Sequence, residues 1–456
     1  MKKKLISALL SVAMVATLLV GCGGSEEAAP AAEAPAAEET EEAAPAEEPA
    51  AEEPAAEEAS AAEGEVYMFI ASPEYADAIN ELIDAYAEVA PNVTINYETT
   101  QNDYPTLLKA KLNSGEVPDI FSSTSGKEID VYKEWSFDLT GQPLEGTMDP
   151  AVAAMMKSPE SGDGLYGIAI KGNYFGIVYN KAIFEEVGIS EFPKTLSGLE
   201  EACEKISAAG YKPFTTVFAE WWVFKHAAQS FVNVAAKEAG ISSAEVVSSI
   251  VSGEKTVADY PAMGERFFDF IDLCVKYGDD KPLETALANE EAALANGEAA
   301  MTIGQGAWIE ADVMSINPDF QLGFSGYPVS EDPADCQVIA GSDQALRINK
   351  DSANLQATLD FINWWYTSDY GMAWFNDVAG VVPPILSDQE SAFEVIKQGS
   401  ALSAADGSGD LNICFSTDSF HQTFGEIMQA YIAGTTSRED AVKSIAEQWA
   451  SIENAN

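Results

Sequence analysis

Basic residues and histidine are scarce in this chain. Its 456 residues include 24 lysines and arginines and 2 histidines, against 74 aspartates and glutamates, so the formal net charge at pH 7 is -50. A field of this sign repels nucleic acid and anionic lipid head groups, and it disfavours anionic solutes as ligands. We therefore expect no nucleic-acid partner, whereas neutral and cationic solutes remain open.

Motifs of catalysis and of metal binding are also missing. The histidines, His226 and His421, lie in no nucleophile motif, and the chain has neither a P-loop nor an HExxH sequence. Residues 162–167 match G-x-G-x-x-G, but they precede a strand-like run instead of following a strand, so a dinucleotide site is not indicated. We expect no enzyme activity, no cofactor and no metal.

Cysteine is rare as well, with five in the whole chain. After Cys22 they are widely spaced and form no C-x-x-C pair, which argues against zinc and a redox dithiol. Two disulfides are an alternative that the sequence cannot pair, among Cys203, Cys274, Cys336 and Cys414. For Cys203 and Cys274, which lie in amphipathic helical stretches, small buried thiols are favoured.

The first residues have the pattern of a secretory signal. Three lysines precede the apolar stretch 5–20, which is too short and wrongly flanked for a lasting membrane span. The stretch ends in Leu19-Val20-Gly21-Cys22, which resembles the lipobox of bacterial lipoproteins. We expect residues 1–21 to be removed and Cys22 to carry lipid; an ordinary secretory signal with an incidental cysteine is the alternative.

Residues 22–64 follow as a segment of very low complexity. From residue 25 to residue 63 the chain is almost entirely Ala, Glu and Pro, with no aromatic residue and no Lys or Arg. Such a composition cannot bury enough apolar surface to offset the entropy of ordering. We expect a disordered, extended tether. Without its glutamates and the signal lysines, 60 acidic and 21 basic residues remain, so the rest of the chain is itself acidic.

Strand and helix patterns alternate at the start of the remaining chain. Buried runs of strand type are separated by apolar residues at helical spacing, and parallel strands joined by crossovers follow from this order. Later stretches are mainly helical, and the last helix begins after Ser437. Some 390 residues exceed one usual core, so two lobes are expected. The expected strands are 66–70, 93–97, 119–121 and 176–179, and the expected helical regions are 79–86, 104–112, 181–187, 196–277, 354–376 and 438–453.

Several short motifs follow one another in a fixed order along the chain. They are GEVPDIF at 115–121, GLYGI at 164–168, VYNK at 178–181 with Phe184 and Gly188, FPKT at 192–195, NGEAAMTI at 296–303 with Trp308, GSD at 341–343, and DF at 360–361 with YG at 370–371. Taken together and in this order, they resemble the bacterial extracellular solute-binding family that includes maltose-binding protein. Two departures from the family pattern are Ala169 in place of a proline and Leu196 in place of a tryptophan.

The resemblance implies an α/β fold of two lobes with a hinge between them and a ligand in the cleft. Lobe one would be 65–172 plus 341–385, and lobe two 173–340 plus 386–456. It also implies a monomeric protein on the extracellular face of the cell membrane, held there only by its lipid, that delivers a carbohydrate, favoured to be an oligosaccharide, to the permease subunits of an ABC transporter.

A sugar site needs aromatic platforms and short polar side chains, because a sugar has C–H faces and hydroxyl edges. In lobe two the family places such aromatics at Trp221 or Trp222 and at Trp308, which follows Gln305. Adjacent helical residues point about 100 degrees apart, so we expect one of the paired tryptophans to face the cleft and the other to pack. The glycines beside Gln305 would let the backbone approach the ligand.

Further candidates follow strand ends or lie in a late polar and aromatic stretch. For each serine, a satisfied turn or helix cap is the alternative, and for the late stretch it is a capped helix start with a surface histidine. These candidates are Ser72, Tyr75, Ser123, Ser125, Ser342, Asp343, Asp418, Phe420 and His421. In contrast, the helical spacing of Trp364, Trp365, Tyr366, Trp374 and Phe375 predicts core.

Two other functions stay open at this point. A secreted glycoside hydrolase would need two carboxylates across a cleft, and Asp343 and Asp418 are acceptable candidates. A binding protein for a polyamine or another cation would suit the acidic chain. The hydroxyl-rich loops favour sugar, and the family motifs disfavour the hydrolase.

Overall fold

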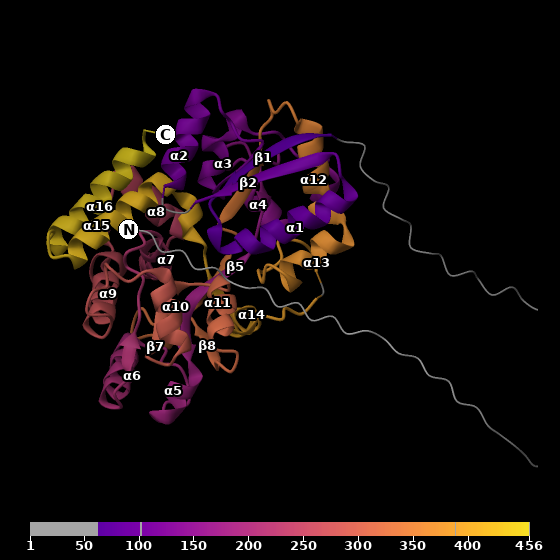
Figure 1. Ribbon diagram of the computed structural model, residues 1–456. Helices are drawn as coiled ribbons and strands as arrows, with labels where there is room; N and C mark the ends of the chain where they lie inside the picture. Colours follow the sequence, from indigo (N-terminus) through magenta and orange to yellow (C-terminus); the bar gives the residue numbers. More distant parts are fainter. Residues whose placement is uncertain (1–62, 101–102, 388, 456) are drawn as a thin grey trace, which may run out of the picture. The chain divides into compact units, whose positions relative to one another are not determined.

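The computed structural model describes residues 63–100, 103–387 and 389–455, and it consists of two β-sheets with helices packed around them (Figure 1). The expected signal segment 1–21, Cys22 and nearly all of the tether lie outside the described residues. In the part of the chain that is described, no helix is long and apolar enough to cross a bilayer. The mixed α/β class predicted from the sequence is confirmed.

The first sheet has the strand order β2-β1-β3-β10-β4. Strand β1 is parallel to both of its neighbours, β2 and β3, as predicted, whereas β10 is antiparallel to both of its neighbours. Strand β10 was not among the strands expected from the sequence, and it is antiparallel because the chain returns to this sheet directly from the second one, without a crossover helix. The strands are β1 (Gly64–Ile70), β2 (Val93–Thr99), β3 (Ile120–Thr124), β4 (Ile168–Ala169) and β10 (Gln344–Ile348).

Helices that connect or flank these strands follow the apolar spacing of the sequence. Helix α1 buries Ile79, Leu82 and Tyr86, and α2 ends at Gly115, whose φ of 79° is the left-handed conformation that glycine adopts without strain. The helices are α1 (Ala76–Val89), α2 (Tyr104–Ser114), α3 (Lys127–Val131), α4 (Pro150–Met155), α12 (Leu355–Thr367) and α13 (Asp369–Asp377).

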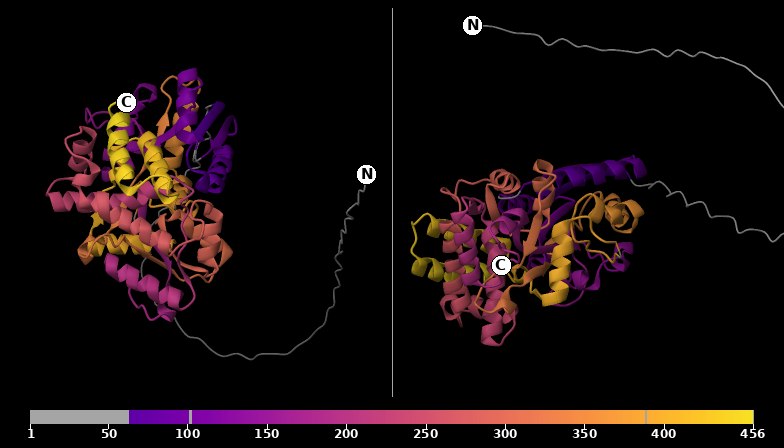
Figure 2. Two further views of the ribbon diagram at one scale, coloured as in Figure 1. Left: turned by 90° about the vertical axis from the view of Figure 1, so that its left-hand side faces the viewer. Right: turned by 90° about the horizontal axis from the view of Figure 1, so that it is seen from below.

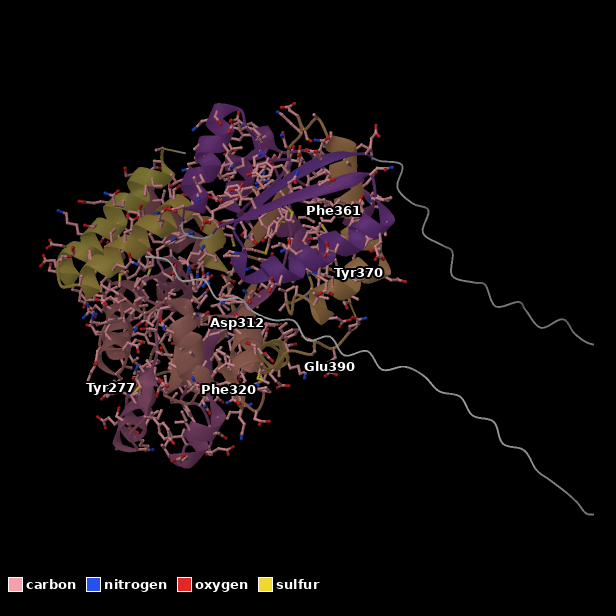
Figure 3. All side chains as sticks on the ribbon, in the orientation of Figure 1. Tyr277, Asp312, Phe320, Phe361, Tyr370 and Glu390 are labelled. Carbon is pink, nitrogen blue, oxygen red and sulfur yellow. The ribbon has the colours of Figure 1, made fainter. Side chains whose placement is uncertain are left out.

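Of the five aromatic residues of α12 and α13 that the sequence predicts as core, Trp365, Tyr366, Trp374 and Phe375 are buried and Trp364 is half-buried. Helix α12 packs against β1 and β10, and Figure 3 marks the two helices by Phe361 and Tyr370. The indole of Trp365 is fully buried, with the ring centroid of Trp374 at 5.0 Å and that of Phe375 at 5.9 Å. Burial of this kind removes these rings from any role in a cleft.

In the second sheet most strand pairs are antiparallel. Its order is β11-β9-β5-β7-β6, and β8 also pairs with β5. The pairs of β5 with β7, β8 and β9 are antiparallel, whereas β6 with β7 and β11 with β9 are parallel. The strands are β5 (Asn173–Asn180), β6 (Lys212–Phe214), β7 (Ala299–Gln305), β8 (Leu322–Ser325), β9 (Val338–Gly341) and β11 (Ser408–Gly409).

Around the second sheet, α7 packs on β7, α15 packs on α7, and α16 packs on α15 and α8 (Figure 2). Ser437 caps α16 by accepting the Asp440 amide, as its sequence indicates. The helices are α5 (Lys181–Glu186), α6 (Leu196–Ala208), α7 (Trp222–Ala239), α8 (Ser243–Val251), α9 (Phe267–Lys276), α10 (Leu287–Ala295), α11 (Trp308–Ile316), α14 (Glu394–Asp406), α15 (Asp418–Ile432) and α16 (Arg438–Glu453).

The described chain passes between the sheets after β4, after β9 and after α13. Hydrogen bonds tie these crossing segments together: Ser342 Oγ donates to the Lys171 carbonyl at 2.6 Å, and the Gly172 amide donates to the Val382 carbonyl at 2.7 Å. Lys171, Ser342 and Asp343 therefore lie at the joint between the sheets.

All four cysteines of the described residues are buried free thiols. Of the two alternatives left by the sequence, the structure has the small buried residues and not the disulfides. The residues are Cys203, Cys274, Cys336 and Cys414.

Candidate functional site

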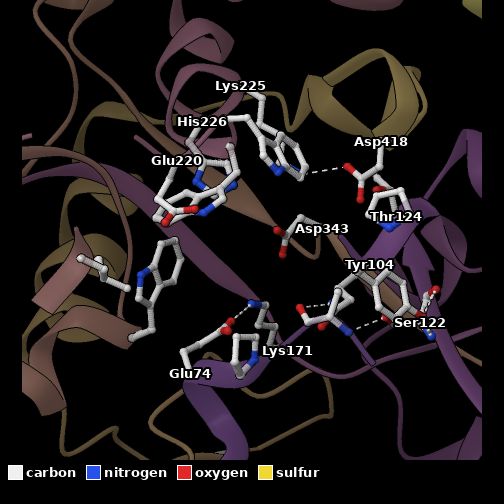
Figure 4. Close-up of a pocket in the computed structure, with 18 of the residues that line it drawn as sticks. Glu74, Tyr104, Ser122, Thr124, Lys171, Glu220, Lys225, His226, Asp343 and Asp418 are labelled. Atoms are coloured by element: carbon white, nitrogen blue, oxygen red, sulfur yellow. Dashed lines mark hydrogen bonds and ion pairs between the residues drawn. The ribbon is translucent and has the colours of Figure 1, made fainter. Parts of the chain in front are cut away.

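A cleft of about 530 Å³ receives side chains from elements of both sheets. One side is formed by the segment after β1, the end of β3 and the start of α2. The opposite side is formed by the starts of α7 and α11, and the crossing segments contribute Lys171 and Asp343 (Figure 4). Six of the thirteen predicted ligand contacts line this cleft, namely Ser123, Trp221, Trp222, Trp308, Asp343 and Asp418.

Tryptophans make the apolar wall of the cleft. The ring centroids of Trp222 and Trp308 lie 6.4 Å apart at an interplanar angle of 75°, and the His226 ring lies 5.4 Å from Trp222 and 5.8 Å from Trp308. Both Trp221 and Trp222 line the cleft, although we expected only one of them to do so. The arrangement offers aromatic surfaces to the C–H groups of a bound molecule.

Gln305 lies behind this wall. It is fully buried; its Oε1 accepts the Trp308 indole N–H at 2.8 Å, and its Nε2 donates to Glu290 at 2.7 Å. Gln305, predicted as a ligand contact, is therefore placed to fix the orientation of Trp308. The neighbouring glycines serve packing instead of ligand approach: a Cβ at Gly304 would lie 2.7 Å from Val223 Cγ1, and one at Gly306 would collide with the Trp308 ring.

Tyr104, at the start of α2, joins the wall that faces the tryptophans. Its hydroxyl accepts the Ser122 amide at 2.8 Å and lies 3.1 Å from the Phe69 carbonyl, so it links the ends of β1 and β3. Ser123 also lines the cleft here. Tyr104 was not singled out from the sequence, where its apolar spacing in a helix indicated only packing.

The other three candidate serines are buried and already hydrogen-bonded. Ser72 Oγ donates to Gln344 Oε1 at 2.7 Å, Ser125 Oγ donates to the Ser342 carbonyl at 2.6 Å, and Ser342 Oγ donates to Lys171. None of the three lines the cleft, and nor does Tyr75, whose buried ring lies 4.8 Å below the Lys171 ammonium. They lie behind the cleft lining, and the three serines are satisfied by long-range hydrogen bonds instead of the turns or helix caps considered from the sequence.

Two lysines enter the cleft, and each is paired with a carboxylate (Figure 4). Lys171 Nζ lies 3.1 Å from Glu74, and Lys225 Nζ lies 2.9 Å from Asp418. Burial opposes the charged form of Lys171, but Tyr75, Glu74 and Asp343 together raise its pKa. Each lysine therefore already has a carboxylate as its counter-charge.

Asp418, the first residue of α15, is the one member of the late candidate stretch that lines the cleft. His421 Nδ1 lies 3.1 Å from its carboxylate. Burial raises the pKa of Asp418, but Lys225 and His421 outweigh it and lower the pKa overall. Phe420 stacks on Trp449 at 4.4 Å, and Phe420 and His421 line a separate small cavity of about 50 Å³.

Sequence reasoning missed most charged residues of the cleft. Glu220 directly precedes the tryptophan pair and Lys225 follows Trp221 by one helical turn, a spacing that could have indicated a shared face. Glu74, Asp77, Lys171 and Asp312 carry no such local signal. His226 is buried, its Nδ1 is 2.9 Å from the Gly304 carbonyl, and burial lowers its pKa well below the usual value, so it is a neutral member of the wall.

Glu128, on α3, joins the two sides beneath the cleft. Its two oxygens accept the Thr124 amide at 2.8 Å and the Asp418 amide at 3.0 Å. Burial, with the nearby Asp418 carboxylate, raises the pKa of Glu128 to about 7. The folded protein thus holds a proton that the unfolded chain releases near pH 4.5.

A pH dependence of stability follows from this group. Since the pKa of Glu128 is higher in the folded state, its contribution to the unfolding free energy falls as pH rises from about 4.5 to 7. We expect Glu128→Gln to flatten this part of the profile by about 1–3 kcal/mol. Urea unfolding of both proteins at several pH values measures this, and equal slopes would contradict the assignment.

Comparisons with known proteins identify the family of this chain. The family model for bacterial extracellular solute-binding proteins matches residues 81–402. A multiple sugar-binding protein of Streptococcus mutans is 24% identical over 333 residues, covering 68% of this chain and 73% of the relative. A melibiose/raffinose/stachyose-binding protein of Bacillus subtilis is 22% identical over 304 residues, covering 65% and 68%.

Among solved structures, a sugar transporter protein from Bacillus licheniformis in complex with stachyose superposes with a TM-score of 0.71. It is 17% identical, and the match covers 85% of this chain and all of that one. The chain belongs to the bacterial extracellular solute-binding protein family. This is a family of binding proteins and not of enzymes, so the hydrolase alternative has no support.

Proposed function

We propose that this protein is the lipid-anchored receptor of an ABC importer and that it binds a carbohydrate, in particular an oligosaccharide. The observation that carries the proposal is the cleft, in which tryptophans lie opposite hydroxyl and carboxylate groups from the other sheet. Aromatic faces suit the C–H faces of a sugar ring, and the polar groups suit its hydroxyls. The relatives named above, which are sugar-binding proteins, support the same ligand class.

Anchoring and assembly are part of the same proposal. The signal segment 1–21 is removed, Cys22 carries the lipid, and the tether 22–64 lets the receptor reach the permease subunits from the extracellular face of the membrane. The body binds as a monomer. Lobe one, 65–172 plus 341–385, and lobe two, 173–340 plus 386–456, close on the ligand about the crossing segments.

Affinity in this cleft requires several contacts at once. A micromolar Kd corresponds to about 8 kcal/mol, whereas one hydrogen bond contributes about 1 kcal/mol net. The proposed contacts from the second sheet and its helices are Trp221, Trp222, Trp308 and Asp418, and those from the first sheet and the crossing segments are Ser123 and Asp343. The buried candidates behind the cleft position these groups.

Calorimetric titration of the purified protein tests the proposal. The panel contains monosaccharides, neutral oligosaccharides such as stachyose, amino-sugar oligosaccharides and the polyamine spermidine, and each mixture is assayed for cleavage products. We expect saturable binding of an oligosaccharide with a micromolar Kd and no product. Binding of spermidine alone, or cleavage of a saccharide, would contradict the proposal.

A further inference from the structure

Carboxylates greatly outnumber cations in the lining of the cleft. The two lysines and six carboxylates leave a formal charge of about four negative units, and His226 is held neutral by burial. The six carboxylates are Glu74, Asp77, Glu220, Asp312, Asp343 and Asp418. Because Lys171 is paired with Glu74 and Lys225 with Asp418, the other four have no lysine of their own in the lining.

Some polar atoms of this lining are buried and lack any partner within the described residues. They are Asp343 Oδ1, Glu220 Oε2 and Trp221 Nε1. Trp221 is only 7% exposed, so its indole N–H has lost nearly all contact with water. In Figure 4 the Asp343 carboxylate points into the middle of the cleft, between the Glu74 and Lys171 pair on one side and His226 on the other. A ligand that satisfies these atoms must donate to two carboxylates and accept from one indole.

These observations favour one kind of saccharide, and we propose that the natural ligand bears at least one protonated amine that lies against Asp343 and Glu220. The inference rests on the carbohydrate function proposed above. Neutral hydroxyls can donate to a carboxylate, but they leave its charge uncompensated when the cleft closes and water is excluded. An ammonium group supplies both the donors and the compensating charge, and hydrogen bonds between charged groups are the stronger class.

A pair of carboxyl groups at the edge of the cleft also indicates that the cleft has too few cations for its carboxylates. Asp312, on α11, lies where elements of the two sheets approach one another (Figure 3), and it interacts with Glu291 of α10. Burial and the Asp312 charge raise the pKa of Glu291 to about 7, and burial raises that of Asp312. This pair retains a proton near neutral pH, and a cation bound nearby would release it.

The aromatic wall is compatible with such a ligand. Ammonium groups of the chain itself already lie over two of its rings, with Lys225 Nζ 5.1 Å from the Trp221 centroid and Lys171 Nζ 5.5 Å from that of Trp308. Tryptophan faces attract cations as well as C–H groups. A sugar ring with an amine substituent can therefore use the same wall as a neutral ring.

Calorimetry with matched ligands tests the inference. The probes are β-1,4-linked glucosamine oligomers of two to four units and their N-acetylated counterparts, titrated at pH 6.5 into the full protein. We expect the amine forms to bind at least tenfold more tightly than the neutral forms. Their affinity should fall at least fivefold between about 50 and 500 mM NaCl, because salt screens the charges. Binding in buffers of different ionisation enthalpy should also reveal proton release.

Single-residue variants distinguish the effect of side-chain charge on binding from the effect of side-chain shape. Asp343→Asn keeps the size of the side chain, and we expect it to weaken amine-form binding at least tenfold. Neutral-sugar binding should weaken by a smaller factor, about fivefold or less, because the amide oxygen can still accept from a hydroxyl. Asp84→Asn, at an exposed position of α1 away from the cleft lining, is the matched control and should change neither. Thermal unfolding of each variant confirms that the folded proteins are being compared.

The possible failures of the two proposals differ. If neutral oligosaccharides bind as tightly as amine forms, or bind when no amine form does, the amine inference is wrong and the carbohydrate function stands. Salt-independent binding of the amine forms, or an unchanged affinity in Asp343→Asn, would likewise overturn only the inference. If spermidine binds and no saccharide does, or if nothing in the panel binds, both proposals fail.

Discussion

Arg347→Met is expected to lower the unfolding free energy by about 3–5 kcal/mol, because it leaves several buried acceptors without a donor. Arg347 is fully buried on β10. Its guanidinium donates to the Tyr166 carbonyl at 2.6 Å, the Glu128 carbonyl at 3.0 Å and the Ile129 carbonyl at 2.9 Å. Burial lowers the pKa of Arg347 to about 9, so the group remains a cation at neutral pH.

Urea unfolding at pH 7 measures this loss. Arg347→Lys is the matched variant: it keeps the charge but cannot reach all of the acceptors in the fixed geometry of a guanidinium, so an intermediate loss is expected. A change below about 1 kcal/mol in Arg347→Met would show that the acceptors find other partners. Since Arg347 also donates to Ser123 Oγ at 3.2 Å, its loss should disturb the first-sheet side of the cleft too.

Arg347 also illustrates what a sequence leaves out. Its acceptors lie some 180 to 220 residues earlier in the chain, on α3 and before β4, so no local pattern indicates them. Strand β10 is antiparallel for a similar reason, since its direction depends on where the chain re-enters the sheet. By contrast, α16 was predicted with its observed bounds, because the Ser437 cap and the apolar spacing are local signals.

The site residues also include some that the sequence could indicate and others that it could not. The tryptophans could be predicted because the family motifs carry their positions, and they do line the cleft. The serines at strand ends look equally suitable in the sequence, yet Ser72 and Ser125 point into the protein, where Gln344 and the Ser342 carbonyl accept their hydrogens. Whether a side chain faces the cleft or packs in the interior behind it depends on tertiary contacts. The spacing of residues in the sequence does not determine these contacts.

The charge pairs in the cleft lining were the least predictable feature. Lys171 and Glu74 are 97 residues apart, and Lys225 and Asp418 are 193 residues apart. The composition predicted an acidic protein, but it could not predict which acids would be compensated. The proposed preference for an amine-bearing saccharide therefore depends on the structure, whereas the carbohydrate class was within reach of the sequence.

Trp222→Ala and Trp308→Ala are each expected to weaken saccharide binding about 30- to 150-fold, since a buried aromatic contact of this kind is worth about 2–3 kcal/mol. The two indoles form the edge-to-face wall of the cleft, and a sugar ring that loses one of them loses most of an apolar face. Calorimetric titration with the oligosaccharide identified from the panel measures the effect.

The burial of both rings shapes the design of this experiment. Trp222 is 6% exposed and Trp308 is 9% exposed, so alanine also leaves a cavity and lowers stability, and binding must be measured well below the unfolding midpoint of each variant. Phenylalanine at the same positions preserves more of the packing and should give a smaller loss of affinity. Trp364→Phe is the control, because Trp364 stacks on Tyr370 at 5.8 Å on the helices behind the first sheet. Unchanged affinity in both alanine variants, with the proteins folded, would mean that the saccharide does not bind against this wall.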